Sequence, residues 1–247
     1  MAKDTTGRLH VQVKTGGKRK LSSKLWLERQ LNDPYVVKAK ALGYRSRAAF
    51  KLLEIDDKYR LLKHGMAVVD LGAAPGGWSQ IAAKRVGSVD GKGKVVAIDL
   101  LDMPEIAGVD FAQLDFMDND APAKLTAMLR GGADIVMSDM AANTTGHRKT
   151  DQLRIVGLIE TAAAFACDVL KPGGAFLAKT FQSGADADLL AQLKRDFATV
   201  RHVGEARGQQ AGFLRALCAG DGVSRRAARP GLTCHAHMSM TFTSITS

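Results

Sequence analysis

Short apolar runs along the chain alternate with longer stretches in which apolar residues recur at helical spacing. The short runs predict buried strands over residues 67–70, 94–100, 109–115, 134–140, 175–181 and 199–203. The helical spacing predicts helices over residues 48–59, 151–170 and 186–197, another that starts near Trp78, and two helical segments between Ser22 and Ala41. This regular alternation predicts an α/β fold with a doubly wound, mostly parallel sheet.

The stretch from Met66 to Gln80 organises this pattern, because it joins the first strand to a helix through a glycine-rich turn. Gly72 and Gly76 let the backbone approach a ligand closely, and the N–H groups of the following helix offer polar contacts. The spacing is G-x-x-x-G-G, which differs from the G-x-G-x-x-G of dinucleotide-binding folds. The turn therefore favours S-adenosylmethionine (SAM) over NAD, with Trp78 packed near it.

Four acids fall at the predicted carboxyl ends of strands, where open α/β sheets bind ligands: Asp70, Asp99, Asp115 and Asp139. Any one of them could be a helix cap or a loop residue, but four in register indicate a site. Asp99 is placed to accept hydrogen bonds from ribose hydroxyls, and Asp115 to hold an adenine amino group. Asp139 is expected near the sulfonium of SAM and the reacting centre.

Lys179 is the least expected residue of its otherwise apolar strand, and it lies close to the same edge of the sheet. A partly buried lysine gives up its proton more readily than an exposed one, and a second cation such as Lys51 strengthens that effect. Lys179 is therefore a candidate general base towards a hydroxyl group.

The net charge of +10 is concentrated at the ends of the chain. Residues 1–30 carry +6, residues 204–247 carry +3, and the middle carries the remaining +1. A basic arm over residues 1–22 on a nearly neutral body predicts a polyanionic partner such as nucleic acid, although a solvated basic tail has the same composition. Arg45, Arg47 and Lys51 form a candidate basic edge for RNA phosphates, with a solvated helix face as the alternative.

The cysteines and the lengths of the apolar runs indicate the compartment of the protein and whether it binds a metal. Cys167, Cys218 and Cys234 are odd in number and widely spaced, which suits reduced thiols. Cys234, His235 and His237 have no second ligand pair at zinc-finger spacing, so we expect no metal site. No apolar run approaches the roughly 20 residues of a membrane span. We therefore expect a cytoplasmic protein.

Four motifs in order along the chain resemble those of the FtsJ-like (RrmJ/RlmE) ribosomal RNA 2′-O-methyltransferases. They are RSRAAFKL from Arg45, VDLGAAPGGWSQ from Val69, SDMAAN from Ser138 and AKTFQ from Ala178. The resemblance runs from about residue 22 to residue 203, so residues 23–203 are expected to form the methyltransferase domain. It implies a Rossmann-like SAM-dependent methyltransferase fold.

The resemblance also implies an activity, which is methylation of the ribose 2′-hydroxyl of a uridine in the A-loop of 23S rRNA, within the large ribosomal subunit. Lys51, Asp139 and Lys179 match three members of the family's Lys-Asp-Lys-Glu catalytic set, with Lys179 as the base. The positions that match SAM contacts are Gly76, Trp78, Asp99, Asp115 and Asp139, to which the glycine turn adds Asp70 and Gly72. We expect a monomer.

The fourth catalytic member, a glutamate in a last strand that reads like ELYVLATGFR in the family, is absent. Residues 215–225 (RALCAGDGVSR) can be encoded by a sequence that reads ELYVLATGFR when moved on by one base. We therefore expect a frameshift near residue 203, which would make residues 204–247 an aberrant tail foreign to the fold. Losing several half-buried apolar side chains, at ~1.5 to 3 kcal/mol each, predicts a weakly stable or inactive protein.

Two other functions remain open at this point. The missing glutamate favours a pseudoenzyme that binds SAM or RNA without catalysis. A methyltransferase acting on small molecules would share the fold, but the basic arm and the pair of Lys51 and Lys179 argue against it.

Overall fold

The computed structural model describes residue 28 and residues 31–141, 146–181, 187–203 and 211–218. The predicted basic arm over residues 1–22 and most of the helical segment after Ser22 lie outside these ranges. Cys234 and the histidines beside it lie outside them as well. Within the described chain, no helix is long and apolar enough to cross a membrane.

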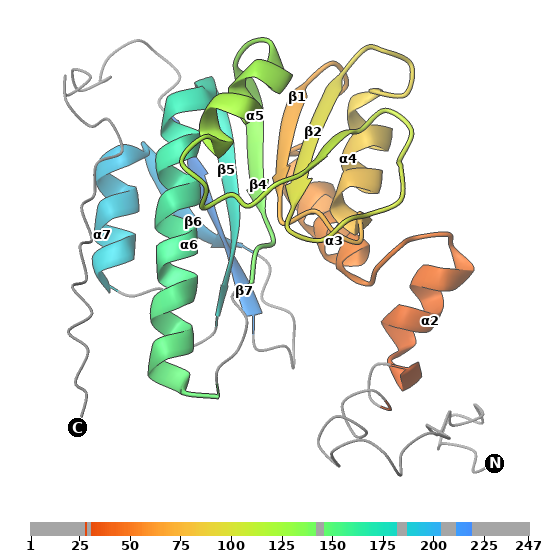
Figure 1. Cartoon of the computed structure of the whole chain (residues 1–247), viewed down its shortest axis with the longest axis horizontal. Coiled ribbons are helices and arrows are strands. Elements are labelled where there is room, and N and C mark those ends of the chain that lie inside the picture. The colour runs from red at the N-terminus through yellow and green to blue at the C-terminus, as the bar shows by residue number, and fades with distance from the viewer. Residues whose placement is uncertain (1–27, 29–30, 142–145, 182–186, 204–210, 219–247) are drawn as a thin grey trace, which may run out of the picture.

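Seven strands of the described chain form one sheet in the order β3-β2-β1-β4-β5-β7-β6 (Figure 1). Their bounds are β1 Ala67–Leu71, β2 Lys94–Asp99, β3 Asp110–Gln113, β4 Ala133–Ser138, β5 Leu170–Phe181, β6 Thr199–Val203 and β7 Ala211–Leu217. The first five strands are parallel, whereas β7 runs antiparallel to both β5 and β6. The doubly wound, mostly parallel sheet expected from the sequence is confirmed.

The helices cover both faces of this sheet. They are α2 Pro34–Ala41, α3 Ala48–Tyr59, α4 Gly77–Val86, α5 Ala121–Leu129, α6 Arg148–Val169 and α7 Ala187–Asp196. Apolar residues of α5, α6 and α7 share one core cluster with one side of the strands, and those of α3 and α4 share a second cluster with the other side. Figure 1 also shows that α2 stands apart from the sheet, beside α3.

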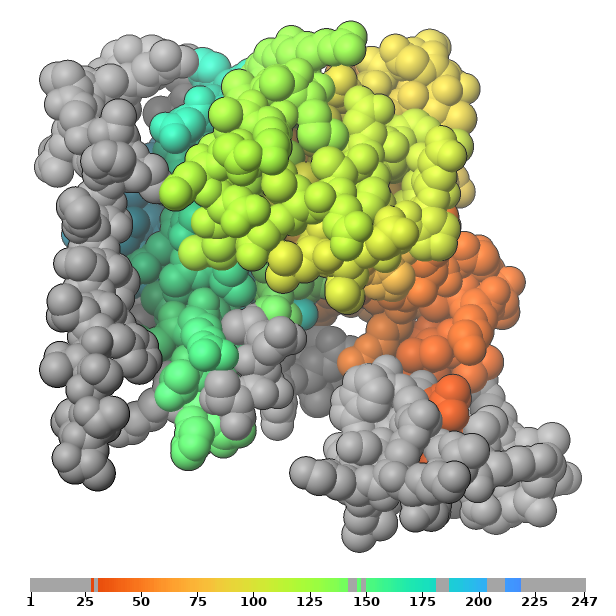
Figure 2. Space-filling view, in the orientation of Figure 1, coloured from red at the N-terminus to blue at the C-terminus, as the bar shows by residue number. Residues whose placement is uncertain are grey.

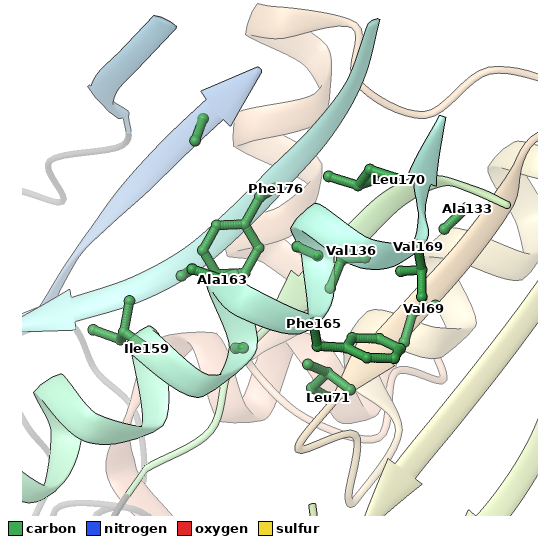
Figure 3. Packing of buried hydrophobic residues seen from close by; sticks show 14 of the residues in the cluster. Val69, Leu71, Ala133, Val136, Ile159, Ala163, Phe165, Val169, Leu170 and Phe176 are labelled. Atoms are coloured by element: carbon green, nitrogen blue, oxygen red, sulfur yellow. The ribbon is translucent and has the colours of Figure 1, made fainter. Parts of the chain in front are cut away.

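Alternation along the strands explains why both faces are covered. In β1, Val69 and Leu71 belong to the first cluster and Val68 belongs to the second. Successive side chains of a strand point to opposite faces, so a strand that is apolar on both sides must be buried on both sides. Figure 3 shows the first cluster, in which Phe176 of β5 and Phe165 of α6 pack among aliphatic side chains.

The predicted element bounds differ from the observed ones by a few residues at most, with one larger difference. The strand expected over residues 175–181 begins at Leu170, because Leu170 already pairs with Ala133 of β4. The pairing register then shifts between Ala133 and Ile135, which accommodates Pro172 and the two glycines that follow it.

The expectation that residues 204–247 are foreign to the fold is wrong for residues 211–217, which form β7. Phe213, Leu214 and Ala216 are buried, and β7 pairs with β5 over seven positions and with β6 over five. Backbone hydrogen bonds do not depend on sequence, so a short segment with suitable apolar residues can fill this gap in the sheet. Residues 204–210 and 219–247 lie outside the described ranges.

Candidate active site

The stretch from Met66 to Gln80, which we call the cradle, contains a glycine turn over residues 72–77 that is held against its surroundings by close contacts. Gly72 has a φ of +78°, and a Cβ there would lie 2.8 Å from Met140 Cγ and 2.9 Å from Met140 Cα. A Cβ on Gly77 would lie 2.2 Å from Ser46 Oγ, so the loop before α3 packs directly on the first turn of α4. Glycine is required at position 72, because a side chain there would push the turn away from the backbone of Met140, whereas a side chain at position 77 would require Ser46 to rotate.

Asp70 lies in the middle of the sheet rather than on an open surface. Its side chain is fully buried, Oδ2 accepts a hydrogen bond from Ser79 Oγ at 2.6 Å, and Oδ1 has no partner among the described residues. Burial raises the pKa of Asp70 to about 7, an effect that the Ser79 hydrogen bond opposes and the nearby Asp139 and Asp99 reinforce. Asp70 therefore holds the first turn of α4 in place through Ser79.

Asp99 and Asp115 each organise the loop that follows their strand. Asp99 Oδ2 accepts from the Ala74 N–H at 2.9 Å, and Asp99 Oδ1 accepts from the Leu101 N–H at 2.8 Å. Asp115 Oδ1 accepts from the Met117 N–H at 2.9 Å. Asp99 thus links the end of β2 to the glycine turn, at the edge where a nucleotide ligand binds in this type of sheet.

A cavity of about 410 Å³ joins the cradle to the residues around Lys179. Its walls come from α2 and the α2–α3 loop on one side and from the glycine turn on the other, with Asp139 and Lys179 lining it as well. Sequence reasoning missed the contribution of α2 and of Tyr44, because their place beside the cradle depends on how helices pack. The lining residues are Val36, Ala39, Lys40, Tyr44, Arg45, Ser46, Arg47, Ala48, Gly72, Ala73, Ala74, Pro75, Gly77, Trp78, Asp139 and Lys179.

Asp139 and Lys179 form an ion pair in this cavity, with 2.9 Å between Oδ1 and Nζ. Asp139 directly follows β4, its N–H donates to the Leu71 carbonyl, and both side chains are 23% exposed. Burial raises the pKa of Asp139, and the Lys179 ammonium opposes that rise. The structure therefore brings together two residues predicted for the catalytic centre, since they lie at the carboxyl ends of neighbouring strands.

Lys51 reaches the same side of the sheet from α3. Its side chain is 12% exposed, and its Nζ lies 3.6 Å from Glu54 Oε2 and 5.9 Å from the centre of the Phe213 ring. Phe213 is the β7 residue that pairs with Lys179. Directly paired residues point to the same face of a sheet, so Phe213 stands on the face where both lysines lie.

Trp78 and Gly76 are enclosed by protein. Trp78 is 2% exposed, and its Nε1 donates to the Ala48 carbonyl at 3.0 Å. A Cβ on Gly76 would lie 2.5 Å from Ile106 Cδ1 and 3.2 Å from Arg45 Cδ. The cradle is thus closed on one side by the α2–α3 loop and by the loop after β2.

The two arginines proposed for RNA both contact protein groups. The Arg45 guanidinium donates to the carbonyls of Pro104 and Glu105 in the loop after β2. Arg47 forms an ion pair with Asp33, the residue that caps α2. These contacts hold the α2–α3 loop against the loop after β2 and against the start of α2. The sequence alone could not predict them, because the partners lie 14 to 60 residues away.

Comparison with known proteins places these features in a family. The FtsJ-like methyltransferase family matches residues 44–207. The ribosomal RNA large subunit methyltransferase E of Bradyrhizobium diazoefficiens is 94% identical over 210 residues, which cover 85% of this chain and 92% of that protein. The protein of the same name from Nitrobacter hamburgensis is 80% identical over the same share of each chain.

A solved structure shares the fold as well. A crystal structure assigned as a ribosomal RNA methyltransferase from Plasmodium falciparum superposes with a TM-score of 0.61 at 29% sequence identity. It covers 71% of this chain and 97% of the other. The four motifs, the glycine cradle beside the pair of Asp139 and Lys179, and these relatives agree, and the chain belongs to the FtsJ-like methyltransferase family.

Proposed function

We propose that this protein transfers a methyl group from SAM to the ribose 2′-hydroxyl of a uridine in the A-loop of 23S rRNA, within the large ribosomal subunit. The observation that carries the proposal is the ion pair of Asp139 and Lys179 in a cavity that continues into the glycine cradle. The names of the two close relatives support ribosomal RNA as the substrate. A ribosomal substrate also favours the cytoplasm as the compartment, and we expect the protein to act as a monomer.

The residues around the cradle fit SAM. The cavity beside the turn is lined by Gly72 and Gly77, and Asp99 presents a carboxylate at the end of β2. Asp115 lies just after β3, the strand next to β2, where it would hold the adenine amino group. When bound, SAM would supply a methyl group on a cationic sulfur, and Asp139, which lines the cavity, would lie near that cation. Gly76 and Trp78 would complete the SAM site.

The chain's own contribution to the reaction is to position and deprotonate the ribose hydroxyl. Lys179 in its neutral form would accept the 2′-hydroxyl proton, which makes that oxygen the nucleophile towards the methyl group that SAM would supply. Asp139 holds the Lys179 side chain in place through the ion pair. Lys51 adds positive charge near the oxygen that becomes negative.

Methyl transfer to undermethylated large subunits tests the proposal, with wild type compared to Lys179→Ala. We expect the rate to fall by a factor of about 10² to 10⁴ in the variant, which is the usual contribution of a general base. Lys92→Ala is the matched control, since Lys92 is exposed at the far end of the sheet, before β2. Mapping 2′-O-methylation in rRNA from cells with and without the gene identifies the nucleotide.

A second candidate function is a pseudoenzyme that binds SAM or RNA without catalysis. It is favoured by Phe213 and Arg215, which stand on β7 where the family's last strand carries a glutamate. The same assay separates the two functions. Equal background in wild type and Lys179→Ala, with SAM still raising the melting temperature of both, would leave the pseudoenzyme as the function.

We further propose that the reading frame changes near residue 203. The family match ends at residue 207, and the alignment with the Bradyrhizobium relative leaves 37 of the 247 residues outside. Resequencing the gene decides this point. A shifted frame that does not encode ELYVLATG would disprove the frameshift.

A further inference from the structure

We propose that the exposed side chains of α2, Tyr35 and Lys38 on one side of the helix and Lys40 on the other, form the surface on which single-stranded RNA next to the methylated nucleotide binds. We call it the α2 surface. This inference rests on the proposed function, because it assigns a second binding surface to the same RNA. It also replaces Arg45 and Arg47 as the main phosphate contacts, since both of those side chains are engaged by protein groups.

The charge of this region fits a polyanion. Residues 34–53 contain five cations and no acid: Lys38, Lys40, Arg45, Arg47 and Lys51. Lys38 and Lys40 are exposed, and neither forms an ion pair with any residue that the structure describes. Cations without an acidic partner can replace the counterions of RNA phosphates, which is the main source of affinity in such complexes.

The aromatic residues of the α2 surface fit a stacked base. The Tyr35 ring lies 6.0 Å from the Phe50 ring, and Phe50 in turn contacts Tyr44 edge-on at 5.5 Å. Phe50 thus supports one side of the Tyr35 ring, yet Tyr35 remains 46% exposed. Lys38 Nζ lies 5.2 Å from the Phe50 ring centre, which holds its ammonium beside Tyr35. An exposed, supported ring next to a lysine matches a base and its phosphate.

The Lys40 side of α2 adjoins the catalytic centre. Lys40 lines the same cavity as Asp139 and Lys179, and so do Val36 and Ala39 of the same helix. In the space-filling view, the orange atoms of α2 and α3 form a lobe beside the yellow and green body (Figure 2). A strand of RNA whose ribose enters the cavity would therefore pass over α2. The base must be unstacked from its neighbours to reach Tyr35, which favours a loop over a duplex.

Fluorescence anisotropy with the full-length protein and a labelled RNA hairpin that carries the A-loop tests the inference. We expect Tyr35→Ala to weaken binding by about 5- to 150-fold, the range observed when a stacking aromatic is removed. Tyr35→Phe keeps the ring and should stay within about twofold of wild type. Equal losses in both variants would show that stacking is not the contact, and would overturn the proposal.

The salt dependence of the same binding tests the two lysines. The double variant Lys38→Gln, Lys40→Gln should reduce the slope of log affinity against log salt by about 1.4, which is about 0.7 for each lost phosphate contact. The matched control is Lys63→Gln, Lys92→Gln, which removes two exposed lysines at the other end of the strands and should leave the slope unchanged. Equal slopes in the two double variants would overturn the proposal.

Failure of this inference and failure of the proposed function give different results. If wild type and all variants bind the hairpin equally, the α2 surface is excluded and an RNA substrate stands. If wild type binds no RNA while SAM still raises its melting temperature, the RNA substrate fails, and the α2 surface with it. An unchanged SAM-induced shift in each variant shows that the substitution has not disturbed the fold.

Discussion

The cradle and the C-terminal edge of the sheet are both built from paired strands, but they differ in how their polar groups are satisfied. In and around the cradle, the carboxylates of Asp99 and Asp139 each have a specific donor, and Asp70 accepts from Ser79 through one oxygen, although its other oxygen is buried without a partner among the described residues. At the edge, β7 makes its backbone pairs and buries Phe213, yet the Nε of Arg215 is buried without a partner among the described residues.

This difference separates what any suitable segment can do from what only a selected sequence does. Strand pairing uses backbone groups that every residue has, so residues 211–217 can occupy the position of a last strand. A catalytic site needs particular side chains at particular positions, and there β7 offers Phe213 opposite Lys179. The cradle contains the side chains proposed to hold SAM, whereas β7 contributes backbone pairing and buried apolar side chains.

Restoring the shifted frame after residue 203 is expected to have the largest effect. It would replace Phe213 and Arg215 by the sequence of the family's last strand, with its glutamate on the face of Lys51 and Lys179. We expect methyl transfer to undermethylated large subunits to rise by a factor of about 10² to 10⁴, the range for one positioned acid or base. The control is the restored chain with that glutamate changed to glutamine. Equal rates for the chain as written and the restored chain would contradict this prediction.

Asp70→Asn is expected to have the next largest effect, and it tests the cradle. Because burial raises the pKa of Asp70 from 3.8 to about 7, the folded protein holds this proton more tightly than the unfolded chain. The free energy of unfolding should therefore fall as the pH rises from about 4 to about 7. The asparagine variant stays neutral and can still accept from Ser79, so it should be more stable than wild type by up to about 4 kcal/mol at pH 8.

Urea unfolding at several pH values measures this difference, which should shrink steadily as the pH falls towards 4. Asp90→Asn makes the same chemical change at an exposed residue and serves as the control. If Asp70 contributes to SAM binding, the variant will be stabilised less by SAM than wild type is. A wild-type stability that rises between pH 4 and pH 7 more than that of the variant would contradict the assignment.

Much of the architecture could be predicted because periodicity reports which faces are buried. The helix over residues 48–59 and the strand over residues 199–203 have the predicted bounds, and Asp139 and Lys179 were expected at one edge of the sheet. The partners of Arg45 and Arg47 could not be predicted, because they depend on how loops pack. β7 was not predicted, because it is stabilised by pairing with β5 and β6 and its own residues show little strand periodicity.

Gly72→Ala tests the packing of the cradle and is expected to destabilise the protein by about 3 kcal/mol. Part of this cost is the left-handed backbone, about 1 to 2 kcal/mol, and the rest comes from the contact of the new Cβ with the backbone of Met140. Gly91→Ala is the matched control, since Gly91 has a φ of +69° and open space around its Cβ position. It should lose only the backbone part. Equal losses in urea unfolding would show that the approach of Met140 is not tight.

Arg215→Met gives the smallest effect and tests the C-terminal edge directly. A buried donor without a partner costs about 1 to 3 kcal/mol, and the loss of the contact between Arg215 and the Tyr59 ring, at 5.7 Å, offsets about 0.5 to 1 kcal/mol. We expect a net stabilisation of about 1 kcal/mol in urea unfolding. Arg201→Met is the control, because Arg201 pairs with Arg215 but is exposed. Destabilisation by Arg215→Met would mean that β7 is as well adapted to its position as the cradle is, and would remove the physical argument for a foreign segment.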